Sequence, residues 1–129
     1  MAEFVYKDYS CELTFGNLKY ELPLNEQTAD LLEKTFTDET ITPKASNIEE
    51  MDAFYNKLMD AVDSVLGEGA AADIMNGFKH AGSMELLSVV NYIVTEWEAQ
   101  YALVVEEMKK TAQLPNRETR RANNKGGRR

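Results

Sequence analysis

The chain of 129 residues is 43% hydrophobic and 28% charged, and its net charge is −8. This composition is ordinary for one soluble globular domain and excludes a collagen-like or wholly disordered chain. No stretch approaches the ~20 apolar residues that cross a bilayer, and the first residues lack the order of a secretion signal. Because the single cysteine, Cys11, has no internal disulfide partner, we expect a cytoplasmic protein without a membrane segment.

The N-terminal region predicts a β-hairpin. Residues 11–15 and 18–22 each alternate apolar with polar side chains, and they flank a two-residue turn that begins with Gly16. Because glycine accepts a positive φ at the first turn position, this pattern is typical of a two-residue hairpin. Residues 4–6 predict a third short strand. Pro23 has no backbone donor, so it ends the ladder.

A short amphipathic helix follows over residues 26–36, and Asn25 is its expected N-cap. Its apolar residues, among them Leu32 and Phe36, recur at the three- and four-residue spacings of a buried helix face. Residues 37–45 contain three threonines and a proline, so they predict a loop.

A longer amphipathic helix is predicted over residues 47–66. Ser46 and Glu49 match a capping box, in which each side chain accepts a hydrogen bond from the backbone N–H of the other residue. Gly67 is placed to end this helix in a left-handed conformation.

Residues 70–80 predict a further short helix that buries Ile74 and Phe78. His80 then lies near its C-terminal end, where the helix dipole favours a cation. Ser83 is the expected N-cap of the next element.

The longest predicted element is a helix from Met84 to about Ala112. Its apolar residues recur in steps of three and four and form a nearly straight seam of Leu86, Val90, Ile93, Trp97, Tyr101, Val104 and Met108. At 1.5 Å per residue this helix is about 43 Å long, whereas a globule of this size has a radius of gyration near 13 Å. Either the hairpin and helix 47–66 cover the whole seam, or part of it contacts another chain.

Residues that carry chemistry are sparse. The single histidine, His80, and the single cysteine, Cys11, lie far apart in the sequence and form a poor set for a metal or a nucleophile–base pair. Acid pairs such as Glu106-Glu107 fall on polar helix faces or in loops, where a catalytic carboxylate would not be desolvated. No phosphate-binding glycine motif is present. We therefore expect no enzyme, no metal site and no cofactor.

The charge is polarised along the chain. Residues 116–129 carry six cationic side chains against one glutamate, a net charge of +5, which leaves −13 for residues 1–115. Since Ala122 is the one apolar residue beyond Pro115, we expect a single domain over 1–115 and a disordered, flexible basic tail over 116–129. The tail either contacts nothing, docks on an acidic partner, or contacts nucleic acid, although the acidic body repels phosphate backbones.

Several segments occur together in this order: the hairpin, LPLNEQTADLLEKTF, MDAFYNKLMDAVDSVLGEGAAADIM, VVNYIVTEWEAQY and the ending LPNRETRRANNK. Over about residues 11–125 this order resembles the small tail assembly chaperone-like proteins of long-tailed phages and prophages of Firmicutes. The segment LGEGAAADIM and the Asn-Arg-x-x-Arg-Arg ending are its most distinctive parts.

The resemblance implies a non-catalytic protein without cofactor. It would coat the tape-measure protein, a long helical rod, until tail-tube subunits polymerise around it. It would act in the cytoplasm of the bacterial host cell and be missing from finished virions. Two groups of side chains would then contact partners. They are Trp97, Tyr101, Val104 and Met108 on the long helix, and Arg117, Arg120, Arg121, Lys125, Arg128 and Arg129 on the tail.

The sequence thus predicts an α+β, mainly helical domain, with an N-terminal β-hairpin packed on about four helices and a long C-terminal helix. The leading function is a phage tail assembly chaperone that binds tape-measure and tail-tube proteins, with a homo-oligomer as a further expectation. One alternative is a virion structural protein, such as a head–tail connector or a tube-associated protein. Another is a small nucleic-acid-binding regulator that uses the basic tail.

Overall fold

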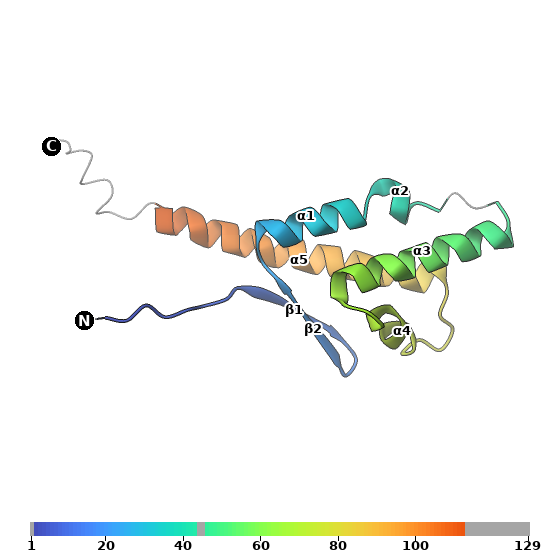
Figure 1. Ribbon diagram of the computed structural model, residues 1–129, viewed down its shortest axis with the longest axis horizontal. Helices are drawn as coiled ribbons and strands as arrows, with labels where there is room; N and C mark the ends of the chain where they lie inside the picture. The colour runs from blue at the N-terminus through green and yellow to red at the C-terminus, as the bar shows by residue number, and fades with distance from the viewer. Residues whose placement is uncertain (1, 44–45, 113–129) are drawn as a thin grey trace.

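The computed structural model describes residues 2–43 and 46–112 (Figure 1). It is mainly helical with one antiparallel hairpin at its N-terminal side, which confirms the predicted α+β class. In chain order the elements are β1 (Ser10–Phe15), β2 (Leu18–Pro23), α1 (Glu26–Thr35), α2 (Asp38–Ile41), α3 (Ile48–Leu66), α4 (Ala70–Met75) and α5 (Ser83–Ala112).

The hairpin forms where the sequence predicts it, and Gly16 has a φ of +62° at the turn. In the antiparallel register Cys11 lies opposite Leu22 and Leu13 lies opposite Tyr20. This pairing places the apolar residues of both strands on one face, because residues directly opposite each other in a ladder point to the same side. Cys11, Leu13 and Leu22 are buried in the core.

The core lies between the hairpin, α3 and α5. α3 packs against α1, α4, α5 and β2, and β1 packs against α5. Leu58 and Val62 of α3 and Leu86 and Ile93 of α5 are fully buried. Since burying one such side chain stabilises a fold by about 1.5–3 kcal/mol, these residues make the pair of long helices the centre of the domain.

Asparagine side chains begin α1 and α3. Asn25 Oδ1 accepts a hydrogen bond of 2.9 Å from the backbone N–H of Thr28, as predicted. At α3 the cap is Asn47, whose Oδ1 accepts from the N–H of Glu50 at 2.8 Å. The predicted Ser46 cap is therefore wrong by one residue. Asn47 has an extended backbone, so its side-chain oxygen can accept a hydrogen bond from the unpaired N–H of Glu50, three residues later in the first turn of the helix.

The second half of that capping arrangement is also displaced. Glu50, rather than the predicted Glu49, reaches back to the start of α3, where its Oε1 accepts from the Ser46 N–H at 3.0 Å and from the Ser46 hydroxyl at 2.7 Å. These bonds lower the pKa of the Glu50 carboxyl, the hydroxyl having the larger effect. At the other end of α3, the helix stops at Gly67 as predicted and the φ of this residue is positive, +118°, but its ψ of 155° lies outside the left-handed helical conformation that the sequence predicts.

Two predictions for short segments are wrong. Residues 4–6 form no strand, because β1 pairs only with β2 in the part of the chain that the structure describes. The predicted loop over 37–45 contains the one-turn helix α2, which is capped by Thr37 Oγ1 accepting from the Thr40 N–H at 3.2 Å. A single turn of four residues has no apolar periodicity that would predict it.

The helix predicted over 70–80 is shorter, since α4 ends at Met75. Gly77 lies two residues further on, and glycine destabilises a helix interior by about 0.5–1 kcal/mol relative to alanine. Phe78, predicted to be buried, is 38% exposed, and His80 lies in an exposed bend rather than at a helix end.

α5 begins at Ser83, so this residue lies inside the helix instead of capping it. The 30 residues of α5 span about 45 Å, whereas the 19 residues of α3 span about 28 Å. In Figure 1 the last turns of α5 accordingly extend past the hairpin and α1. None of the described helices is long and apolar enough to span a membrane. The predicted basic tail lies outside the described residues.

Candidate protein-binding site

The apolar seam of α5 changes from core to surface along its length. Leu86 and Ile93 are fully buried, and Trp97 is 3% exposed. Tyr101 is half-buried one turn later, and Met108 is 46% exposed. The solvent-accessible part of this seam therefore begins after Trp97.

Trp97 binds within its own chain. Its indole N–H donates a hydrogen bond of 2.9 Å to the carbonyl oxygen of Pro23, and its ring stacks on Tyr101 with centroids 4.6 Å apart at an angle of 15°. The indole N–H thus has its hydrogen-bond partner, and the ring packs within the same domain. Its placement among the partner contacts is not supported, and Tyr101 has one ring face committed to Trp97.

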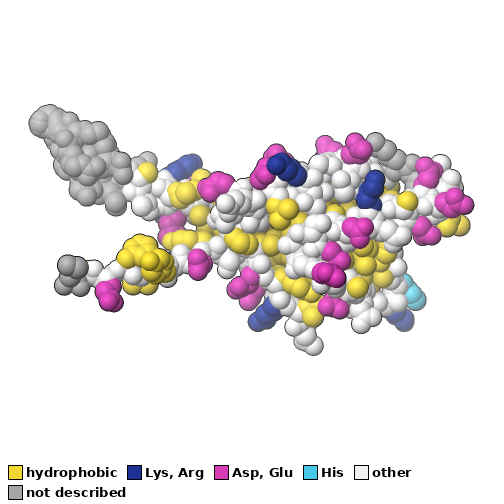
Figure 2. Space-filling view, viewed as in Figure 1, with side chains coloured by type: hydrophobic (Ala, Val, Ile, Leu, Met, Phe, Trp, Pro, Cys, Tyr) yellow, Lys and Arg dark blue, Asp and Glu magenta, His cyan; other side chains and the backbone are white. Residues whose placement is uncertain are grey.

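A groove opens where the seam emerges from the core. It has a volume of about 630 Å³ and lies between the last turns of α5 and the residues that precede β1 and follow β2. We call it the α5 groove, and its lining residues are Tyr9, Leu24, Val104, Glu107, Met108, Thr111 and Ala112. In Figure 2 hydrophobic atoms lie along this end of the molecule, on and beside the last turns of α5. The structure thus brings the predicted Val104 and Met108 together in one apolar groove.

A backbone hydrogen bond fixes the wall opposite α5. The N–H of Leu24 donates to the carbonyl oxygen of Tyr9 at 2.9 Å, so the hairpin hydrogen bonding continues one residue past Pro23, where the sequence predicts that it ends. Sequence reasoning missed both residues. Leu24, an apolar residue directly before the N-cap Asn25, carried a weak signal, because this position often packs on the following helix turn.

α5 also carries an exposed apolar residue outside the groove. Leu103 is 69% exposed and does not line the α5 groove. Leu103 therefore provides a control position, because a substitution there changes the exposed surface of α5 outside the groove.

The predicted basic contacts of the tail fall outside the described residues. They are Arg117, Arg120, Arg121, Lys125, Arg128 and Arg129. They remain predictions.

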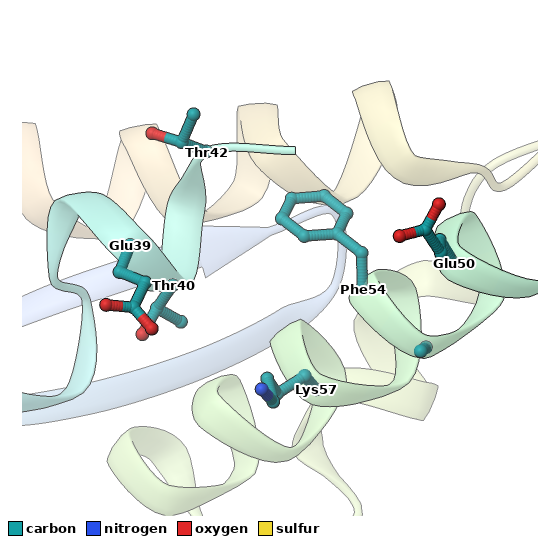
Figure 3. Close-up of a pocket in the computed structure, with 7 residues that line it drawn as sticks. Glu39, Thr40, Thr42, Glu50, Phe54 and Lys57 are labelled. Atoms are coloured by element: carbon teal, nitrogen blue, oxygen red, sulfur yellow. The ribbon is translucent and has the colours of Figure 1, made fainter. Parts of the chain in front are cut away.

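A second cleft, shown in Figure 3, lies between α2 and α3 and encloses about 260 Å³. Glu39, Glu50 and Lys57 contribute its charged groups, and Phe54 lies between the two helices. The Glu50 carboxylate already accepts two hydrogen bonds from Ser46. The residues that line this cleft include no histidine, cysteine or serine.

Cys11 is the buried nucleophilic group of the hairpin. Burial raises the pKa of its thiol, and the negative charge of Glu96 raises it further. Both effects disfavour the thiolate, which is the reactive form. Within residues 2–43 and 46–112, no three histidine, cysteine or acidic side chains gather closely enough to hold a metal ion.

Comparison with known proteins identifies no relative of this chain. No protein-family model, no curated protein sequence and no solved structure matches it significantly.

Proposed function

We propose that this chain is a non-catalytic phage tail assembly chaperone, which holds a helical segment of the tape-measure protein in the α5 groove. The observation that carries the proposal is the protruding end of α5, where Val104 and Met108 line an apolar groove that the domain leaves open. The resemblance of the sequence to phage tail assembly chaperone-like proteins indicates the tape-measure protein as the partner.

The groove has dimensions that suit a helix. From Val104 to Ala112 it follows about 12 Å of α5, or a little over two helical turns. An amphipathic helix lying along it would place side chains spaced by three or four residues against Val104 and Met108, a familiar mode of peptide recognition. The apolar lining supplies affinity, because each aliphatic side chain that becomes buried contributes about 1.5–3 kcal/mol.

Charged groups at the rim would orient such a helix. Glu107 lines the groove, and Lys109 and Lys110 lie in the last turn of α5. Rim charges set orientation and association rate more than affinity. Under this proposal the basic tail adds weaker contacts that decrease with salt.

Co-expression with the tape-measure protein tests the proposal. The tagged full chain should capture the tape-measure protein, and Met108→Lys should reduce capture at least tenfold, because a charge would then be buried in the groove. Leu103→Lys, an exposed position of α5 that does not line the groove, should capture as well as the unmodified chain. Failure to capture the tape-measure protein, or equal capture by both variants, would contradict the proposal.

Purified particles separate this function from a structural one. A chaperone should be missing from finished virions, whereas a connector or tube-associated protein persists in them. Detection of the chain in tailed particles at a fixed copy number would favour the structural alternative.

A further inference from the structure

The structure has a second exposed apolar feature, which lies on residues 2–8. We call this segment the N-terminal arm. Phe4, Val5 and Tyr6 are 79%, 79% and 89% exposed, and the Phe4 and Tyr6 rings meet edge to face with centroids 5.0 Å apart. Figure 2 shows hydrophobic atoms gathered on this arm. Three consecutive large apolar side chains in water mark an interaction surface.

The arm begins at the edge of the α5 groove. Tyr9, the residue after the arm, lines the groove, and its carbonyl oxygen is held by the Leu24 N–H. In Figure 1 the arm runs from β1 toward the same end of the molecule as the last turns of α5. Even so, the arm leaves its own groove open, since Met108 is 46% exposed.

We propose that two copies of this chain pair by exchanging arms. The N-terminal arm of each copy lies in the α5 groove of the other, with Phe4 and Tyr6 against Val104 and Met108. The exchange is reciprocal, so the same two surfaces are used twice and the assembly closes as a dimer. A second copy is the occupant that covers both exposed apolar features at once.

The connection to Tyr9 favours exchange over closure within one chain. In the structure the arm does not enter its own groove, because none of residues 2–8 lines it. The Lys7 ammonium lies 4.7 Å from the centroid of the Tyr9 ring, a cation–π contact that supports the extended course.

The arm also has the length and area that a dimer needs. Seven extended residues span about 23 Å, enough to cross the groove. One buried aromatic side chain removes about 150–250 Å² from water. Two arms and their two grooves together would bury on the order of 1,200–2,000 Å², the size of an ordinary specific interface.

Charges at the two surfaces are complementary. Glu3 and Lys7 flank the apolar triplet of the arm, while Glu107 and Lys110 lie a turn apart at the end of α5. When arm and helix run in opposite directions, with Phe4 against Met108, Glu3 lies toward Lys110. Such pairs set the register of the arm and add little affinity at the surface.

Arm exchange would regulate the proposed site. In a step that rests on the proposed function, a tape-measure helix competes with the arm for the α5 groove and separates the two copies as it binds. The dimer itself does not depend on that function. A chain that dimerises but does not capture the tape-measure protein would contradict only the proposed function. A monomer that does capture it would contradict only the arm exchange.

Sedimentation velocity of the full chain is the first test. The unmodified chain and Leu103→Lys should sediment as dimers. The double variant Phe4→Ser/Tyr6→Ser and the groove variant Met108→Lys should sediment as monomers. All of these positions are exposed, so unchanged far-ultraviolet circular dichroism will show that the fold is intact. A monomeric unmodified chain, a dimer that survives the arm variant, or an assembly larger than two copies would overturn the proposal.

Disulfide trapping identifies the occupant of the groove. Tyr6→Cys and Met108→Cys, purified separately and then mixed under mild oxidation, should form a cross-linked heterodimer. Tyr6→Cys mixed with Leu103→Cys should not. Native Cys11 is buried and should not form a disulfide under these conditions. Absence of the heterodimer, or an intramolecular link in a chain carrying both Tyr6→Cys and Met108→Cys, would overturn exchange between copies.

Discussion

Trp97 in α5 and Pro23 at the end of β2 are joined by a hydrogen bond of 2.9 Å, although 74 residues separate them in the chain. The indole N–H donates and the Pro23 carbonyl oxygen accepts. This bond ties the exit of the hairpin to the middle of α5. Because Leu24 follows Pro23 directly and lines the α5 groove, the same bond positions one wall of the groove.

Replacing Trp97 by phenylalanine should destabilise the domain. Trp97→Phe keeps an aromatic ring but removes the donor to the Pro23 carbonyl from this part-buried bond, which costs about 0.5–1.5 kcal/mol. Urea unfolding followed by circular dichroism measures the change. Tyr101→Phe keeps the stacked ring and should stay within about 0.5 kcal/mol of the unmodified chain. Equal stability of Trp97→Phe and the unmodified chain would show that the hydrogen bond is dispensable.

The cap of α3 makes a prediction that separates two neighbouring residues. Asn47→Ala removes the acceptor for the Glu50 N–H and should lower the free energy of unfolding by about 1 kcal/mol. Ser46→Ala removes only the hydroxyl bond to the Glu50 carboxylate and should have a smaller effect. Denaturant unfolding of both variants decides the point. A larger loss for Ser46→Ala would restore the serine cap that the sequence alone predicts.

The Glu50 carboxylate predicts a pH dependence with a definite sign. Its pKa in the folded chain is lowered from the ordinary value of 4.5, mainly by the Ser46 hydroxyl and then by the Ser46 N–H. The folded chain therefore binds this proton less readily than the unfolded chain. The resulting stabilisation is fully present above the unfolded-state pKa and is lost as the pH falls through the folded-state pKa.

The difference in stability between the unmodified chain and Glu50→Gln should accordingly be largest near neutral pH and shrink in acid. Glu49→Gln is the matched control, since Glu49 makes no such bond to Ser46. Urea unfolding at several pH values below 6 measures the trend. A difference that grows as the pH falls would contradict it.

Cys11 should resist thiol reagents in the folded chain. Its side chain is fully buried, and burial raises the pKa of the thiol. Modification by a disulfide reagent then requires opening of the structure and should be at least about a thousandfold slower than in denaturant. A comparison of the two rates at one pH tests this. Rapid modification of the folded chain would show that the hairpin detaches locally from α5.

Much of the fold was predictable because it depends on local patterns. Alternation on both sides of Gly16 defines the hairpin, and spacings of three and four residues define α1, α3 and α5. The errors occur where local signals compete. Ser46 and Asn47 both favour a cap, and in the structure it is Asn47, with an extended backbone, whose side chain caps α3.

The candidate site was predictable only in part. Val104 and Met108 follow from the seam, but their partners across the groove, Tyr9 and Leu24, come from the other end of the chain. No pattern along the sequence records which distant segments meet. The same limit explains Trp97, which belongs to the same seam as Met108 yet lies in the core.

The sequence by itself determined that α5 has one continuous apolar face, because helical periodicity depends only on residue spacing. Only the tertiary structure decided how far along that face the core extends. α3 and the hairpin are shorter than α5, so they cover Leu86 to Trp97 and leave Val104 and Met108 accessible. Burial is a property of what lies opposite a residue, and the lengths of the neighbouring elements set it.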